Sequence, residues 1–345
     1  MKIAFFTYPA AFQNVGGGEI LLLKVREYLQ KEGAEVDLFD TWKGHIQDYQ
    51  VLQVFGSVKD CLGLVRVAKS RGVKVAVTPL LWSDPWYALH SAGSVKTKVE
   101  LLARHTMKVL FPAFPSARRE LLRLADVVFP NSEIEKEQNA RLFALPKEKL
   151  KVIHNGVDEE FSHAVAAPFQ AKYGPEPFVL GVGRIEPRKN QLNLIHAVKK
   201  AGGIRLILIG SPVSGYESYF AECEKEGKSF TTFIPTLSHS DPMLRSAYAA
   251  CSLFVLQGWF ETPGLVAMEA GLAGARVIAT RGGSTREYFK REVDYFDPAN
   301  PADIAKKIRI NLSKPKYESF ARLIRENYTW DRIAKAYLAA YRGML

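Results

Sequence analysis

The sequence predicts an α/β protein built from two doubly wound domains, each with a parallel sheet. Short apolar runs alternate with helix-patterned segments along most of the 345 residues, as expected for strands that are buried on both faces. The alternation pauses between residues 161 and 177, a loop-like stretch with three prolines, and then starts again. We therefore expect a first domain at 1–165, a second at 166–327, and a last helix at 328–345 that packs back on the first domain.

Composition limits the classes of partner. The net charge of +11 favours anionic partners, but no helix-turn-helix, zinc-finger or aromatic-basic RNA signature is visible, so we expect no nucleic acid. Cys61, Cys223 and Cys251 lie far apart, which fits a reducing cytoplasm. No window reaches the ~18 apolar residues of a membrane span, and the chain begins directly with an apolar strand pattern. We expect a cytoplasmic protein without a secretory signal.

The first half starts with a strand at 3–8, a glycine loop at 13–19 and a helix from about Ile20 to Lys31. The glycine spacing is not that of a dinucleotide fingerprint. Three successive glycines let a backbone approach a polar ligand closely, although a plain turn explains them equally well. Strands are expected next at 36–39, 51–55 and 73–77, then a loop rich in proline and aromatic residues at 79–87, and strands with turns at 125–132 and 151–158.

A basic amphipathic helix is predicted at 95–110. Its apolar side is expected to hold Val95, Val99, Leu102, Val109 and Leu110. Its basic residues are Lys96, Lys98, Arg104, His105 and Lys108, followed on the next helix by Arg118, Arg119 and Arg123. Two interpretations stay open: a solvated helix face, or a surface for an anionic membrane or acceptor.

The second half contains the stretch around which the chain is organised, residues 258–274. It follows the apolar strand pattern at 253–256. Thr262 and Pro263 predict a helix start, as N-cap and first helical residue, and Gly274 predicts its end. Other strands are expected at 178–183, 206–209 and 277–280, and helices from 191, at 216–226, at 242–250 and from about Trp330 to Tyr341.

Two carboxylates in this stretch suggest a ligand. Glu261 precedes the helix N-terminus, where Gly264 leaves backbone N–H groups open to an anion. Glu269 lies six residues past Pro263. At ~1.5 Å per residue, this is about 9 Å along the helix axis. Two glutamates near a helix can also serve packing alone. The preceding strand and the helix-end signals favour a binding site instead. In such a site the helix N-terminus would hold a phosphate, and Glu269 would lie deeper, where it suits a ribose diol. These are the parts of a nucleotide-sugar site.

Together these segments resemble the family 4 glycosyltransferases, whose GT-B fold has two Rossmann-like domains facing a central cleft. The resemblance covers nearly the whole chain. The matching segments are Gly17-Gly18-Glu19, Val152–Asp158, Gly183-Arg184 with Lys189-Asn190, Glu261-x7-Glu269, Gly282-Gly283 and Tyr328-Thr329-Trp330.

The resemblance implies a role for each site residue. Arg184 and Lys189 would bind the donor diphosphate and neutralise the leaving group, and Glu261 would hold the hydroxyls of the transferred sugar. Glu269 would bind the ribose, the backbone of Gly264 and Leu265 the phosphates, the backbone near Phe233–Pro235 the base, and Gly17 and Gly18 would close on the donor from the other domain. No Asp-x-Asp occurs in the sequence, so neither a metal nor another cofactor is expected.

The reaction implied is transfer with retained anomeric configuration from a UDP- or GDP-linked sugar to a glycan or lipid-linked acceptor, as in polysaccharide biosynthesis at the inner face of a membrane. One segment departs from the family. Many members carry a histidine after the fourth strand, where this chain has Thr78–Trp82, and His90 is not assigned that role. Two alternatives follow: a nucleotide-sugar epimerase of the same fold, expected to lack Glu-x7-Glu, and a catalytically silent sugar-binding module.

Overall fold

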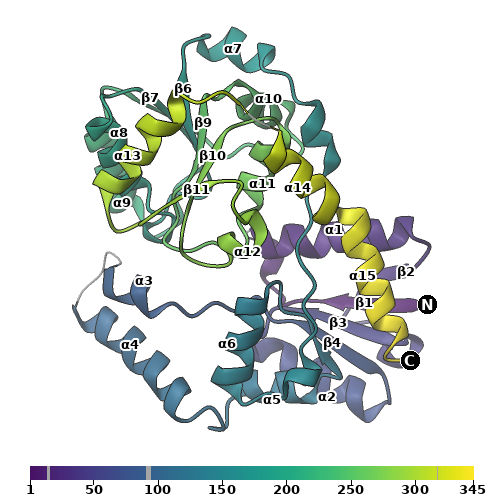
Figure 1. The fold of residues 1–345 in the computed structure, drawn as a ribbon. Helices are drawn as coiled ribbons and strands as arrows, with labels where there is room; N and C mark the ends of the chain where they lie inside the picture. Colours follow the sequence, from purple (N-terminus) through teal and green to yellow (C-terminus); the bar gives the residue numbers. More distant parts are fainter. Residues whose placement is uncertain (14–15, 91–94, 317) are drawn as a thin grey trace. The chain divides into compact units, whose positions relative to one another are not determined.

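The computed structural model describes residues 1–13, 16–90, 95–316 and 318–345 (Figure 1). Contacts divide these residues into two compact units. The first comprises Met1–Ser83, Glu100–Gly156 and Tyr328–Leu345, and the second comprises Asp84–Val99 and Val157–Asn327. Each unit contains one parallel sheet, so the α/β class with two doubly wound domains is confirmed. The domain boundary expected at 165 stays a prediction, because this division follows contacts alone.

In the first unit the described strands pair in the order β2-β1-β3-β4-β5, all in parallel. The strands are β1 Lys2–Phe6, β2 Glu35–Leu38, β3 Val51–Phe55, β4 Lys74–Thr78 and β5 Val127–Val128. The helices of the first part of the chain are α1 Gly17–Lys31, α2 Leu62–Ser70, α3 Pro85–His90, α4 Val95–Leu110, α5 Ala117–Leu124 and α6 Glu133–Phe143, and the last helix is α15 Trp330–Arg342.

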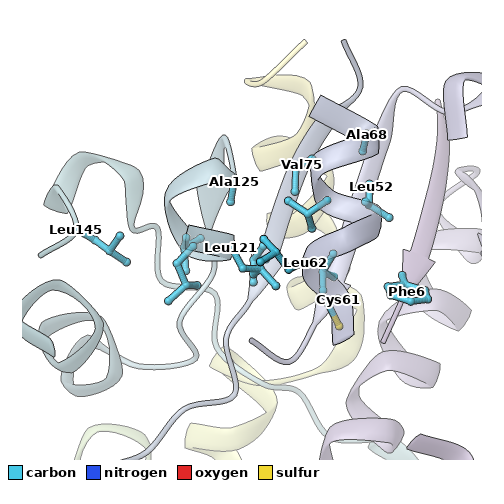
Figure 2. Packing of buried hydrophobic residues seen from close by; sticks show 14 of the residues in the cluster. Phe6, Leu52, Cys61, Leu62, Ala68, Val75, Leu121, Ala125 and Leu145 are labelled. Atoms are coloured by element: carbon cyan, nitrogen blue, oxygen red, sulfur yellow. The ribbon is translucent and has the colours of Figure 1, made fainter. Parts of the chain in front are cut away.

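Helices cover both faces of this sheet. On one face α1 and α15 pack side by side over strand residues such as Ile3 and Val51. On the other face α2 and α5 cover Leu52 and Val75, as Figure 2 shows. The last helix therefore belongs to the first unit, although the chain that precedes it belongs to the second.

The second unit repeats the plan. Its described strands pair in parallel in the order β11-β10-β9-β6-β7-β8. They are β6 Phe178–Val182, β7 Arg205–Ile209, β8 Thr231–Ile234, β9 Leu253–Leu256, β10 Val277–Thr280 and β11 Asp294–Phe296. The helices are α7 Ala167–Tyr173, α8 Gln191–Lys200, α9 Glu217–Gly227, α10 Pro242–Ala250, α11 Leu265–Leu272, α12 Thr285–Phe289, α13 Pro301–Leu312 and α14 Ser319–Asn327. In Figure 1, α8, α9 and α13 lie over one face of this sheet and α10 and α11 over the other.

Several elements differ from the sequence prediction. The segment 151–158, expected to be a strand, does not form one. Its start makes isolated backbone hydrogen bonds to β5, such as Lys151 N to Val128 O at 2.9 Å, and these do not continue as a ladder. Helix α7 lies inside a stretch expected to be a loop, α3 begins inside another, and strands β8 and β11 were not predicted. Short elements of this kind carry too few residues for a clear periodic pattern.

The basic helix α4 has the predicted bounds, but its expected apolar side is divided. Leu102 and Val109 are half-buried, whereas Val99 and Leu110 are 58% and 63% exposed. The side chains of Val95 and His90 lie outside the described ones. Exposed apolar residues continue into the following loop at Phe111 and Phe114. In the part of the chain that the structure describes, no helix is long and apolar enough to cross a membrane.

A buried carboxylate holds the loop that follows β4. The two oxygens of Glu135 accept the backbone N–H groups of Leu81 and Asn131, at 2.8 and 2.6 Å. Burial raises the pKa of Glu135 to about 7, against the lowering effect of these two hydrogen bonds. Glu135 therefore fixes the segment in which the family's histidine is missing.

This carboxylate gives a prediction for stability. Between the ordinary value of 4.5 and about 7, folded Glu135 keeps a proton that the unfolded chain has released. Its contribution to the unfolding free energy therefore falls as pH rises through that window, by up to about 3 kcal/mol. Urea unfolding of the wild type and Glu135→Gln between pH 4.5 and 8 should show the difference between them changing by this amount. Glu133→Gln, at an exposed position on the same helix, is the control, and parallel profiles for wild type and Glu135→Gln would refute the prediction.

Candidate functional site

Two loops meet at the carboxyl edge of the second sheet. Strands β6 and β9 are hydrogen-bonded neighbours, so the loops after them, 183–190 and 257–264, leave the sheet side by side. The backbone joins them directly, because Trp259 N donates to Arg188 O at 3.0 Å. Four of the predicted site residues lie on these loops, and a fifth, Leu265, begins the helix that follows.

An ion pair connects the two loops. Lys189 Nζ lies 2.8 and 3.0 Å from the two carboxylate oxygens of Glu261. Only 16% of the lysine side chain and 7% of the glutamate side chain are exposed. A pair this far from solvent depends on both partners, since removal of one leaves an uncompensated charge. The structure thus brings together two residues that the resemblance assigned separately.

The backbone of Glu261 is fixed by the glycine turn that the sequence singled out. Glu261 bridges to Gly283, and its carbonyl accepts Ser284 N at 2.9 Å. Gly283 has φ +88°, and a Cβ there would lie 2.0 Å from the Glu261 carbonyl oxygen. Only glycine fits this close approach. The Glu261 side chain also lies close to a glycine, since a Cβ on Gly258 would be 2.4 Å from Glu261 Oε1.

Lys189 is placed by a short turn before α8. Pro187–Lys189 forms one 3-10 turn, and Asn190 then takes the left-handed conformation, with φ +58°. The Asn190 side chain donates to Pro298 O at 2.9 Å, which anchors the turn beside the end of β11. Asparagine tolerates this left-handed conformation better than most residues. This local requirement explains why an asparagine follows Lys189.

Arg184 lies earlier in the same loop. Its guanidinium is half-exposed and lies 3.4 Å from Glu186, which also accepts from Arg188 at 3.1 Å. Sequence reasoning missed Glu186 and Arg188. The Arg188 guanidinium lies 5.4 Å above the ring of Phe260, a second contact between the two loops.

The helix after Glu261 begins later than predicted. Helix α11 starts at Leu265 with Gly264 as N-cap, so the assignment of Thr262 as N-cap and Pro263 as first helical residue is wrong. Gly264 has φ +93°, and a Cβ there would lie 2.5 Å from Leu256, so this turn requires glycine. Gly264 and Leu265 stand at the helix start, where backbone amides precede the first full turn, and Ala267 N is the first that donates back, to Gly264 O at 3.0 Å. The predicted end is confirmed, because Gly274 N donates to Gly271 O and Ala275 N to Ala270 O, which is a Schellman motif.

Glu269 lies buried on α11 with a polar neighbour at each carboxylate oxygen. His239 Nε2 is 3.1 Å from Oε1, and Tyr248 donates its hydroxyl to Oε2 at 2.9 Å. Burial raises the pKa of Tyr248 well above 10, and the charge of Glu269 adds to this rise. His239 also lies 3.8 Å from Asp158. Sequence reasoning missed His239 and Tyr248 as partners of Glu269, since they lie 30 and 21 positions away and follow no spacing rule.

An aromatic side chain from the first half of the sequence also reaches the site. Tyr87 on α3 lies 5.7 Å from the ring of Phe260 and 6.4 Å from that of Trp259. Burial raises the pKa of Tyr87, so its hydroxyl stays protonated. The loop that carries Glu261 is thus supported from outside by a helix that the sequence did not predict.

The predicted glycines of the first unit open a helix. Gly17 and Gly18 form the first turn of α1, and Gly16 N donates to Glu19 at 2.8 Å. The expectation that both lie in a loop is therefore wrong, because the helix starts three residues earlier than predicted. Asn14 and Val15 of the same loop lie outside the described residues. The contact of Gly17 and Gly18 with a donor stays a prediction.

Thr78, where the family's histidine is missing, does not replace it. Its hydroxyl is buried and bonds to Gln53 at 3.1 Å and to Tyr337 at 3.3 Å, inside the first unit. Within residues 1–13, 16–90, 95–316 and 318–345, no group of three or more His, Cys, Asp and Glu side chains is arranged to hold a metal.

Comparison with family models assigns the chain to a class, the GT-B glycosyltransferases. Residues 166–330 match the family model described as glycosyl transferases group 1, and residues 15–161 match that of glycosyltransferase family 4. The chain therefore belongs to the family 4-type glycosyltransferases.

Curated relatives agree with this assignment. D-inositol 3-phosphate glycosyltransferase of Mycobacterium sp. (strain KMS) is 32% identical over 168 residues, 46% of this chain and 38% of the relative. An uncharacterised glycosyltransferase of Methanocaldococcus jannaschii is 28% identical over 226 residues, 60% of this chain and 57% of the relative. A probable sucrose-phosphate synthase of Thermosipho melanesiensis is 27% identical over 296 residues, 77% of this chain and 66% of the relative. Each alignment thus spans less than two thirds of the relative's own length.

Solved structures share the fold along the whole chain. Sucrose-phosphate synthase from Thermosynechococcus elongatus has a TM-score of 0.78 at 18% identity, over 100% of this chain and 99% of that one. Anabaena HepE in complex with UDP has a TM-score of 0.75 at 18% identity, over 99% of this chain and 100% of that one. At such identities the likeness shows the GT-B fold alone.

Proposed function

We propose that the protein transfers a sugar from a UDP- or GDP-linked donor to a glycan or lipid-linked acceptor, with retention of anomeric configuration and without a metal. The observation that carries this proposal is the cluster at the carboxyl edge of the second sheet. There the Lys189–Glu261 pair lies beside the start of α11, whose deeper residue Glu269 is a second buried carboxylate.

The donor would lie along α11. The amides of Gly264 and Leu265 at the helix N-terminus suit the diphosphate, and Glu269 suits the ribose hydroxyls. The solved structures of HepE with UDP and with UDP-glucose support a nucleotide-sugar donor, since they share this fold. The chain's net charge of +11 also favours an anionic substrate.

Arg184 and Lys189 would stabilise the leaving nucleotide. The Lys189 ammonium has three N–H donors, so it can hold Glu261 and a phosphate oxygen at once. Glu261 keeps acceptor capacity for a sugar hydroxyl while its charge stays paired. For retention, the acceptor attacks the face from which the phosphate departs, and a phosphate oxygen receives the acceptor's proton. These two cations then do the work that a metal ion does in other transferases.

A transfer assay tests this proposal. The wild type, given UDP- or GDP-sugars with glycan acceptors, should release nucleotide and form product equally well in EDTA. Arg184→Ala should lower kcat at saturating donor about 10–100-fold with little change in donor affinity, since its charge acts on the departing phosphate. Product analysis by NMR gives the anomeric configuration.

The control is Arg205→Ala, which removes an arginine at the opposite end of the same sheet, paired with exposed Glu176. It should leave kcat unchanged. Loss of activity in EDTA with recovery in Mg²⁺ would contradict the metal-free mechanism. Conversion of the donor without any acceptor would favour the epimerase, and binding without turnover would favour the silent module.

We further propose that α4 binds an anionic membrane surface next to a lipid-linked acceptor. Exposed apolar side chains run from Val99 through Met107 and Leu110 to Phe111 and Phe114. The same helix carries the exposed cations Lys96 and Arg104. Apolar residues beside cations are the composition of a helix that lies in a membrane interface.

Arg118 and Arg119 are less suited to this contact than the sequence suggested. Arg118 donates to Ser57 O at 2.8 Å and Arg119 to Phe143 O at 3.0 Å. Both guanidinium groups therefore have a structural role within the first unit.

The membrane proposal predicts salt-sensitive sedimentation with anionic but not neutral vesicles. Lys96→Glu with Arg104→Glu should lower binding about tenfold or more, because each cation near the surface adds roughly 1 kcal/mol. Lys225→Glu with Lys228→Glu on exposed positions of the second unit is the charge-matched control. Equal sedimentation of the wild type and both double variants would show that α4 is a solvated face.

A further inference from the structure

Each carboxylate oxygen of Glu269 has a polar side chain within hydrogen-bond distance. Tyr248 on α10 is fully buried and donates to Oε2 at 2.9 Å. His239, in the loop between β8 and α10, lies 3.1 Å from Oε1, and 26% of its side chain is exposed. The carboxylate is therefore held from the core side by a phenol and from the solvent side by an imidazole.

With these two neighbours in place, the Glu269 carboxylate can still accept further hydrogen bonds. An ionised carboxylate has about four lone-pair sites, two on each oxygen. In the tautomer with a proton on Nε2, His239 donates to Oε1 as Tyr248 donates to Oε2, and one site on each oxygen then remains. Two adjacent acceptor sites on one carboxylate match the two hydroxyl donors of a vicinal diol.

The two neighbours are themselves fixed in place. The ring of Phe161 packs edge-on against both, 5.4 Å from His239 and 5.8 Å from Tyr248. Asp158 lies 3.8 Å from the same nitrogen of His239 that faces Glu269. Groups held by packing and hydrogen bonds keep a recognition carboxylate in one orientation and reduce the entropy lost on binding.

On the basis of the proposed function, we propose that His239 and Tyr248 are positioning residues that orient Glu269 toward the 2′- and 3′-hydroxyls of the donor ribose. The protein would thereby select ribonucleotides over 2′-deoxyribonucleotides. A residue that merely stabilised the fold would affect both nucleotides alike, whereas loss of orientation weakens only the hydroxyl contacts.

The test is calorimetric titration with matched nucleotides, UDP against 2′-deoxy-UDP and GDP against 2′-deoxy-GDP. The wild type should bind the ribonucleotide about tenfold or more tightly, the effect of one lost hydrogen bond to a charged group. In Tyr248→Phe and His239→Leu this ratio should fall at least about threefold. His239→Gln, whose amide can still donate to Glu269, should recover most of the ratio.

Two variants serve as controls. Tyr219→Phe removes a buried hydroxyl that contacts Leu192 N and Gln191 in the same unit. His196→Gln replaces a histidine 3.7 Å from Glu226 on the surface of that unit. Both controls should keep the wild-type ratio.

An unchanged ratio in both Tyr248→Phe and His239→Leu would overturn the inference while leaving the proposed function intact. Equal wild-type affinity for the ribo and deoxy forms would also overturn it. Absence of binding to either pair by the wild type would instead contradict the proposed function. If Tyr248→Phe does not fold, His239→Leu at its partly exposed position decides the outcome.

Discussion

The candidate site depends on one ion pair, Lys189 with Glu261. The pair joins the loops after two neighbouring central strands, and both side chains are largely withdrawn from solvent. Such a pair is stable only when its geometry is fixed, because neither charge can be left alone at this burial. The surrounding residues provide that geometry: Asn190 turns the chain after Lys189, Gly258 makes room for the carboxylate, and Gly283 receives the Glu261 backbone. Gly258 and Gly283, which look like ordinary loop residues in the sequence, are thus needed to hold Glu261 in the ion pair.

The same constraint orders the chemistry along α11. Because Glu261 lies only three residues before Gly264, the N-cap of α11, the ion pair fixes where the helix N-terminus lies relative to the cations. The sugar, phosphate and ribose contacts of a donor would then follow in sequence along one loop and one helix. Such an order would suit the proposed nucleotide-sugar donor, because ligands of parallel sheets bind at the carboxyl edge.

Much of the fold could be predicted from the sequence, because buried parallel strands leave apolar runs and helix ends leave glycine signals. Gly274 is an example, since its left-handed conformation ends α11 where predicted. Local signals failed where a tertiary contact decided the outcome. Gly264 starts α11 in place of Thr262, because the chain first pairs with the turn at Gly283.

For the candidate site, the sequence suggested residues but not the partners that the structure places beside them. Glu261 and Lys189 were predicted as separate ligand contacts, and their pairing across 72 positions was not. His239 and Tyr248 surround Glu269 through topology alone, without a local spacing to reveal them. Partners of this kind follow from which strands are neighbours, and a single sequence does not give that order.

A double-mutant cycle on Lys189→Met and Glu261→Gln tests the central claim most directly, with unfolding free energies measured in urea. Lys189→Met alone should cost about 3–5 kcal/mol, since it leaves Glu261 buried and unpaired, and the double variant should cost less than this single change. The surface pair Lys199–Glu226, at 3.9 Å, should give a coupling below about 1 kcal/mol in the same cycle. Costs for Lys189 and Glu261 that add to within about 0.5 kcal/mol would show that the two residues act independently, and would contradict a site organised around their pair.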